Sequence, residues 1–180
     1  MKKIFLVMFL FIISITSNAE AASKISNSAD AFMSLPFGHS YARTQKRMER
    51  SGAKVFTPRK ESLTMEGFFE GYPAVFIFGF YKNKLLNSKS VYLQSMGNAE
   101  QDKNFYEAMQ KGYNAAFNSS KANPVTNTRN AKKINLQNVW TPDRYTTITL
   151  TYNPDASKRL PGESLSEKFL QLIYKYDKWE

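Results

Sequence analysis

The residues that could carry out chemistry are few, and the first group surrounds the single histidine of the chain. His39 lies next to Ser40 in the segment LPFGHSYARTQKRMER, residues 35–50. A serine, a histidine and an acid can form a hydrolytic triad, but the G-x-S-x-G turn that presents many such serines is absent. We therefore expect His39 to lie at a helix start or on the surface, and we keep catalysis by His39 as the less favoured hypothesis.

The second group is acidic and aromatic. Glu66 and Glu70 lie beside and within the segment GFFEGYP. Burial among aromatic rings could raise the pKa of a carboxylate for glycoside hydrolysis, but that reaction uses a pair of acids and no second acid is evident. Carboxylates on a strand and its loop are usually solvated, so Glu66 and Glu70 are secondary candidates.

Metal and cofactor sites are not expected. The chain has one histidine and no cysteine, and it contains neither the H-x-H nor the H-E-x-x-H spacing of common metal sites. No glycine-rich loop is present that could bind a phosphate, because aromatic side chains occupy the glycine-containing segment GFFEGYP.

Four basic residues share one side of a predicted short helix. The composition of residues 40–50 permits a helix, with Ser40 or His39 available to cap its first turn. Three- and four-residue spacing places four cations on one face of this helix: Arg43, Lys46, Arg47 and Arg50. This face could hold an anionic partner. The alternative is a solvated face on a helix that buries Tyr41 and Met48.

The first residues have the pattern of a secretory signal peptide. Lys2 and Lys3 precede an apolar run of about a dozen residues, which is shorter than the roughly 20 that a membrane-spanning helix requires. Ala19 and Ala21 then form an A-x-A cleavage site. The expected organisation is a signal peptide, a flexible lead-in and a single domain, over residues 1–21, 22–30 and 31–180.

Charge and cysteine content limit the compartment and the partners. Cleavage after Ala21 would leave 159 residues with 23 basic and 14 acidic side chains, a net charge of +9. The absence of cysteine excludes disulfides, a thiol nucleophile and the lipid-bearing cysteine of a lipoprotein. We expect a soluble periplasmic or extracellular protein. Nucleic acid is disfavoured there, which leaves an envelope protein or an anionic lipid or glycan surface.

Hydrophobic periodicity predicts an α+β domain with an antiparallel sheet. A helix is expected over residues 40–50, and a second one begins at the cap Asn98 with Gln101 as reciprocal partner. Strands are expected over residues 61–69, 74–81, 85–94, 134–140, 146–152 and 169–176. The polar segment Lys121 to Lys133 is predicted to be a loop. The predicted order is helix, three strands, helix, three strands, with the helices packed on one face of the sheet.

The segment PFGHSYARTQKRM, followed by GYPAVFIFGFYKNKLL, resembles small exported α+β proteins of the SmpA/OmlA type and β-lactamase-inhibitor-like domains. In those proteins a Phe-Gly-x-Ser/Thr step opens a short helix, and here the step contains Phe37, Gly38 and Ser40. The resemblance implies a binding or accessory role in the envelope. The alternatives are an envelope hydrolase that uses the Glu66 and Glu70 region, and an inhibitor or immunity protein directed at a secreted enzyme.

Overall fold

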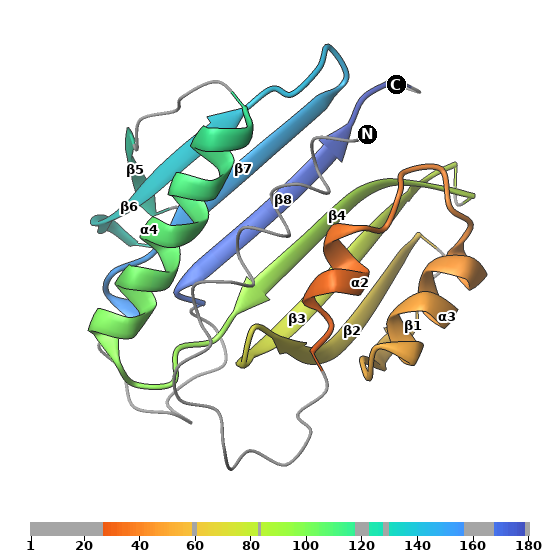
Figure 1. Ribbon diagram of the computed structural model, residues 1–180, viewed down its shortest axis with the longest axis horizontal. Coiled ribbons are helices and arrows are strands. Elements are labelled where there is room, and N and C mark those ends of the chain that lie inside the picture. Colours follow the sequence, from red (N-terminus) through yellow and green to blue (C-terminus); the bar gives the residue numbers. More distant parts are fainter. Residues whose placement is uncertain are drawn as a thin grey trace.

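The computed structural model describes residues 27–58, 61–82, 84–117, 123–127, 130–156 and 168–178. They form one eight-stranded antiparallel sheet with the order β1-β2-β3-β4-β8-β7-β6-β5, and three helices lie in front of this sheet in Figure 1. The predicted α+β class with an antiparallel sheet is confirmed. The predicted signal peptide, residues 1–21, lies outside the described residues.

The first half of the sheet is a meander of four strands, in which each strand pairs with the next. Its strands are β1 (Lys54–Pro58), β2 (Ser62–Phe69), β3 (Tyr72–Tyr81) and β4 (Leu85–Leu93). Two residues with positive φ connect β2 and β3, namely Glu70 at 49° and Gly71 at 83°. This is the backbone of a tight two-residue hairpin turn, for which glycine is well suited.

The second half repeats the meander with β5 (Asn123–Asn127), β6 (Asn130–Trp140), β7 (Thr146–Tyr152) and β8 (Leu170–Tyr176). The halves join where β4 pairs with β8, from Leu93 opposite Leu170 to Ser88 opposite Lys175. Each half therefore has four strands rather than the predicted three. The added strands β1 and β5 are the two edges of the sheet.

The predicted loop from Lys121 to Lys133 is wrong over most of its length, because β5 and the start of β6 lie within it. An edge strand forms a ladder on only one side, so a polar sequence can occupy it without an apolar alternation. Pro124 is compatible with such a position, since an edge strand leaves some of its N–H groups unpaired.

Each helix packs an aromatic ring on the sheet. The helices are α2 (Ala29–Met33), α3 (Tyr41–Arg50) and α4 (Ala99–Ala116). The ring centroids lie 5.0 to 5.6 Å apart in three pairs, one for each helix: Phe32 with Phe76, Tyr41 with Phe80, and Tyr113 with Trp140. In α4, the side chain of Asn98 accepts a hydrogen bond from the N–H of Gln101 at 3.0 Å, which confirms the predicted start of this helix.

Strand β3 shows how the two faces of the sheet differ. Its residues alternate between buried and partly exposed along its whole length, and the buried set includes Phe76 and Phe78. The partly exposed set includes Val75, which stands in one cross-strand row with Tyr92, Gln171 and Thr151. Cross-strand partners share a face. We call the face that carries this row the open face.

Candidate functional site

The start of α3 is fastened to the central part of the sheet by backbone hydrogen bonds. Gly38 has a φ of 86° and donates its N–H to the carbonyl of Leu86 at 2.9 Å. Leu86 in turn donates its N–H to the carbonyl of His39 at 2.9 Å. The side chain of Ser40 caps the helix by accepting from the N–H of Arg43 at 3.4 Å. The Phe37-Gly38-His39-Ser40 step thus orients the helix through its backbone and one hydroxyl.

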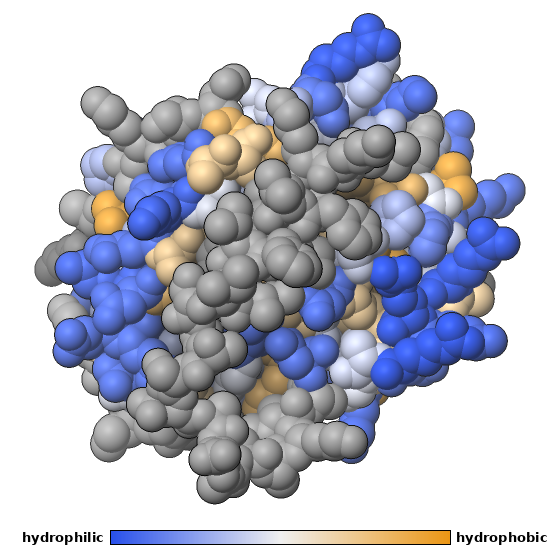
Figure 2. All heavy atoms as spheres, in the orientation of Figure 1, coloured by the Kyte–Doolittle hydropathy of each residue, from blue (hydrophilic) through white to orange (hydrophobic). Residues whose placement is uncertain are grey.

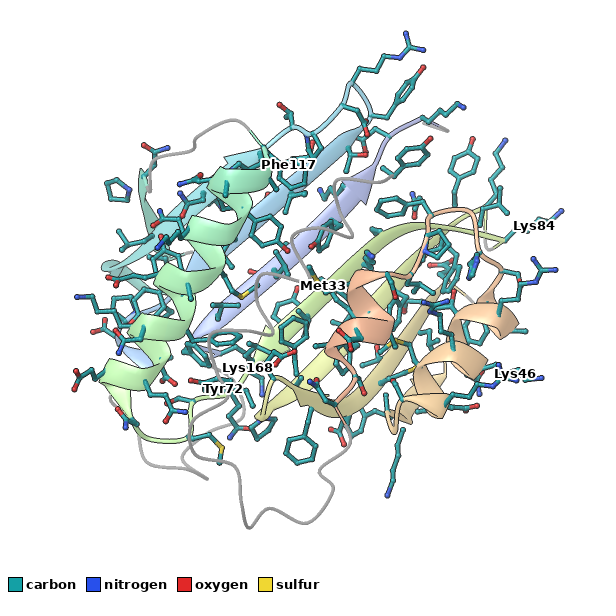
Figure 3. The ribbon with its side chains drawn as sticks, viewed as in Figure 1. Met33, Lys46, Tyr72, Lys84, Phe117 and Lys168 are labelled. Carbon is teal, nitrogen blue, oxygen red and sulfur yellow. The ribbon has the colours of Figure 1, made fainter. Side chains whose placement is uncertain are left out.

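The basic face of α3, defined by Arg43, Lys46, Arg47 and Arg50, is exposed. The opposite side of the helix buries Thr44 and Met48 against the core. Figure 2 shows hydrophilic atoms gathered on the side of the molecule that carries α3, and Lys46 extends away from the helix in Figure 3. The sequence-predicted cations are therefore brought together on one accessible surface.

The one ion pair within the described residues joins Lys103 to Glu107 in α4. None of the four cations of the basic face therefore has a described carboxylate within 4.0 Å. Arg47 makes one side-chain contact instead, donating from Nη2 to the hydroxyl of Ser34 at 2.7 Å. That bond links the basic face to the residue that follows α2. Glu49, the acid of α3, accepts a hydrogen bond from Gln45 at 2.7 Å, and no described acid forms an ion pair with the basic face.

Among the described residues, His39 has no partner of the kind that base catalysis needs. Its Nδ1 atom is buried and makes no hydrogen bond within the described residues. Burial lowers the pKa of His39, and the charges of Arg47 and Arg43 lower it further. The ring is therefore neutral at pH 7, and no described acid orients it as a triad would require.

The two acidic candidates do different things. Glu70 lies in the β2–β3 turn, where its N–H donates to Asn27 Oδ1 and its carboxylate accepts from Asn27 Nδ2, both at 3.1 Å. Glu66 is exposed on β2, between its cross-strand partners Lys54 and Val75. Glu70 thus fastens the chain before α2 to the turn, and it does not join Glu66 in a catalytic pair.

Glu66 lines a pocket of about 450 Å³ at the end of the sheet where β2 and β3 meet. The pocket residues are Gly52, Lys54, Glu66, Gly67, Phe68, Pro73, Ala74, Val75, Gln94 and Lys168. Glu66 is the only acid among them. A single carboxylate cannot act as the acid and base pair of glycoside hydrolysis, so the pocket geometry does not support that chemistry.

Lys89 is a buried cation that sequence reasoning missed. Its Nζ atom donates three hydrogen bonds, to the carbonyls of Phe32, Met33 and Leu35, at 2.8, 2.9 and 2.8 Å. The ring of Tyr174 lies 4.9 Å from the same atom. The three acceptors are at and just beyond the C-terminal end of α2, where free carbonyls and the helix dipole favour a cation. Lys89 therefore anchors α2 to β4.

Burial, and to a smaller extent the charge of Arg47, lower the pKa of Lys89 to about 7. A signal for this residue was present in the sequence, because Lys89 is in phase with Val91 and Leu93, which are both buried. The alternation placed position 89 on the inner face. Only the residue type predicted exposure, because lysine is rarely fully buried.

Two pairs of buried polar side chains, one of two tyrosines and one of a serine and an aspartate, hold α4 in place. The hydroxyls of Tyr113 and Tyr174 are hydrogen bonded to each other, and Tyr174 also donates to Met33 Sδ at 3.3 Å. Burial raises the pKa of both tyrosines. At the start of α4, Ser95 donates its hydroxyl to the buried carboxylate of Asp102. Burial raises the pKa of Tyr72, and the charge of the nearby Asp102 raises it further. The Tyr113–Tyr174 and Ser95–Asp102 pairs are hydrogen bonded within the core and do not form a reactive site.

The described residues contain no group of three or more histidine, aspartate and glutamate side chains placed to hold a metal ion. None of the helices they form has both the length and the apolar composition to cross a membrane. No protein-family model matches the sequence, and no curated protein is significantly similar to it.

Proposed function

We propose that the chain is an exported, non-enzymatic protein that binds an anionic macromolecule of the cell envelope through the basic face of α3. The observation that carries the proposal is the group of four exposed cations with no acid partner among the described residues. Because α3 is fixed by its opposite side and by the Gly38 and Leu86 backbone bonds, the backbone that carries the basic face is preorganised. A preorganised surface loses less conformational entropy on binding.

The arrangement of the cations favours binding of an anionic partner over a basic face that is only solvated. Like charges at three- and four-residue spacing destabilise a helix by about 0.2–0.5 kcal/mol for each pair. The helix dipole offsets this for Arg47 and Arg50, which lie in the last turn, but it disfavours a cation in the first turn, where Arg43 lies. Glu49, three residues from Lys46, relieves part of this repulsion, and an anionic partner would relieve the rest.

The proposal extends to the architecture and the compartment. Helices that cover one face of the sheet would leave the open face for further contact with a partner. The resemblance to SmpA/OmlA-type and β-lactamase-inhibitor-like proteins likewise implies a binding or accessory role. The N-terminal pattern of Lys2, Lys3 and the A-x-A site supports export. The partner is then an envelope protein or an anionic lipid or glycan surface.

The test is a crosslinking pull-down of the tagged protein from its native envelope at several salt concentrations. Arg43→Glu with Arg47→Glu should recover less partner than the wild type and show a weaker dependence on salt, because surface charges are screened over about 8 Å at physiological ionic strength. Lys111→Glu with Lys178→Glu is the control, since both lysines are exposed and the net charge changes equally. Equal recovery by the two double variants would overturn the proposal. Thermal melting of both confirms folding.

A further inference from the structure

The pocket beside Glu66 combines an apolar lining with charges of both signs. Phe68, Pro73 and Val75 supply the apolar part, and all three are partly exposed on β2 and β3. Val75 belongs to the open face, so the pocket opens on the side of the sheet opposite α3. Its volume of about 450 Å³ falls in the range of small-molecule sites.

The charged groups surround the pocket without pairing. Lys54 stands opposite Glu66 in the β1–β2 ladder, and Lys168 comes from the segment before β8. The charge of Glu66 acts on Lys168, raising its pKa against the larger lowering by burial. Neither amine forms an ion pair with this carboxylate within 4.0 Å. The two amines and the carboxylate therefore line the same pocket as separate charges.

The position of Lys168 is fixed by its neighbour in the chain. Phe169 is fully buried, and its ring lies 5.0 Å from that of Tyr72 at the beginning of β3. Figure 3 shows Lys168 and Tyr72 at this end of the sheet. A lysine that is partly buried, and that has no ion pair within the described residues, is costly in free energy, and a bound anion would offset this cost.

We propose that this pocket binds the C-terminal end of a peptide whose last residue is apolar. Two amines and one carboxylate give the pocket a net positive charge, which suits the terminal carboxylate. Glu66 and Gln94 offer oxygen acceptors for peptide N–H groups, and the apolar lining receives the side chain. Capture of a terminal carboxylate is a known mode of peptide recognition. This inference is independent of the basic face of α3.

The test is a titration of the isotope-labelled protein followed by amide chemical shifts. The probes are N-acetylglycylleucine and its C-terminal amide, each added to about 10 mM, which suffices to detect a Kd near 1 mM. The acid should shift the signals of Gly67, Val75 and Gln94. The amide should bind at least about tenfold more weakly, because it lacks the charge that strengthens hydrogen bonds to the lysines.

Lys54→Met and Lys168→Met should each weaken binding of the acid at least about fivefold, as expected for loss of a charge-assisted bond. Lys175→Met, on an exposed lysine of β8 outside the pocket, is the matched control and should bind normally. Lys54 is exposed, so Lys54→Met should fold normally. This variant therefore tests the proposal even if Lys168→Met does not fold.

Three outcomes would overturn the proposal. The first is equal binding of the acid and the amide, and the second is no shift with the acid in this range. The third is unchanged binding of the acid by both Lys54→Met and Lys168→Met, which would mean that neither amine holds its carboxylate.

Discussion

Replacing Lys89 with methionine should destabilise the fold by about 3 kcal/mol. Methionine keeps the length and the apolar stem of the side chain, so the change chiefly removes the ammonium group. The carbonyls of Met33 and Leu35 then lose this donor, while the carbonyl of Phe32 retains the N–H of Leu35 at 3.3 Å. Each buried carbonyl left without a donor costs about 1–3 kcal/mol, and the relief of burying a charge offsets part of the sum.

The assay is urea unfolding at pH 6 followed by circular dichroism, with Lys175→Met as the matched control. Lys175 is exposed, so its variant should lie within about 0.5 kcal/mol of the wild type. A Lys89→Met variant that is as stable as this control would refute the reasoning, because the three carbonyl bonds would then contribute nothing net.

The pH dependence gives a second check on Lys89. Its pKa is about 7 in the folded protein, against a usual value of 10.5. Between these values the unfolded chain binds more protons than the folded one, so stability rises with pH over this window. The difference in unfolding free energy between wild type and Lys89→Met should therefore grow by about 2.7 kcal/mol from pH 6 to pH 9. A constant difference would mean that the carbonyls hold the proton on Lys89 despite its burial.

Three other predictions concern the mature N-terminus, His39 and Ser95. The exported protein should begin at Ala22, and an intact mass that includes residues 1–21 would contradict the signal peptide. His39→Ala should shift the unfolding free energy by at most about 1 kcal/mol and leave envelope binding unchanged, whereas a folded variant that loses function would restore the catalytic hypothesis. Ser95→Ala should lower stability by about 2 kcal/mol, because Asp102 loses one buried hydrogen bond to a charged group; a thermal melt equal to that of the wild type would contradict this role.

The elements with strong periodicity could be predicted because burial repeats along them. Strand β3 was predicted from its continuous run of apolar residues, and in the structure buried and partly exposed residues alternate from Tyr72 to Tyr81. Helix α4 begins at the predicted cap Asn98, since the side chain and the N–H of Gln101 meet within one turn. In both cases the information lies within a few neighbouring residues.

The missed elements carry little of this local information. Helix α2 has five residues, too few for a helical period, and only Ala29 and Phe32 of it are buried. The edge strands β1 and β5 are also five residues long. Their structure is determined by pairing with β2 and β6, and a polar edge strand is indistinguishable from a loop in sequence.

The candidate site was predictable only where it lies on a single element. The cations of α3 share one helix, so their spacing alone placed them together. The pocket depends instead on the approach of Lys168 to Glu66, which are separated by about a hundred positions and meet only because β8 pairs with β4. Lys89 likewise meets acceptors more than 50 positions away.

The two proposed binding surfaces can be separated by mutation because they lie on opposite sides of the same strands. Helix α3 packs through Tyr41 against the buried ring of Phe80, whereas Glu66 and Val75 line the pocket from the open face. Reversing the charge of Arg43 and Arg47 should therefore leave the binding of a peptide acid unchanged. Lys54→Met should in turn leave recovery of the envelope partner unchanged. If either variant impaired both activities, one extended ligand would have to pass around the β1 edge, which is the only edge of the sheet next to both surfaces in the described residues.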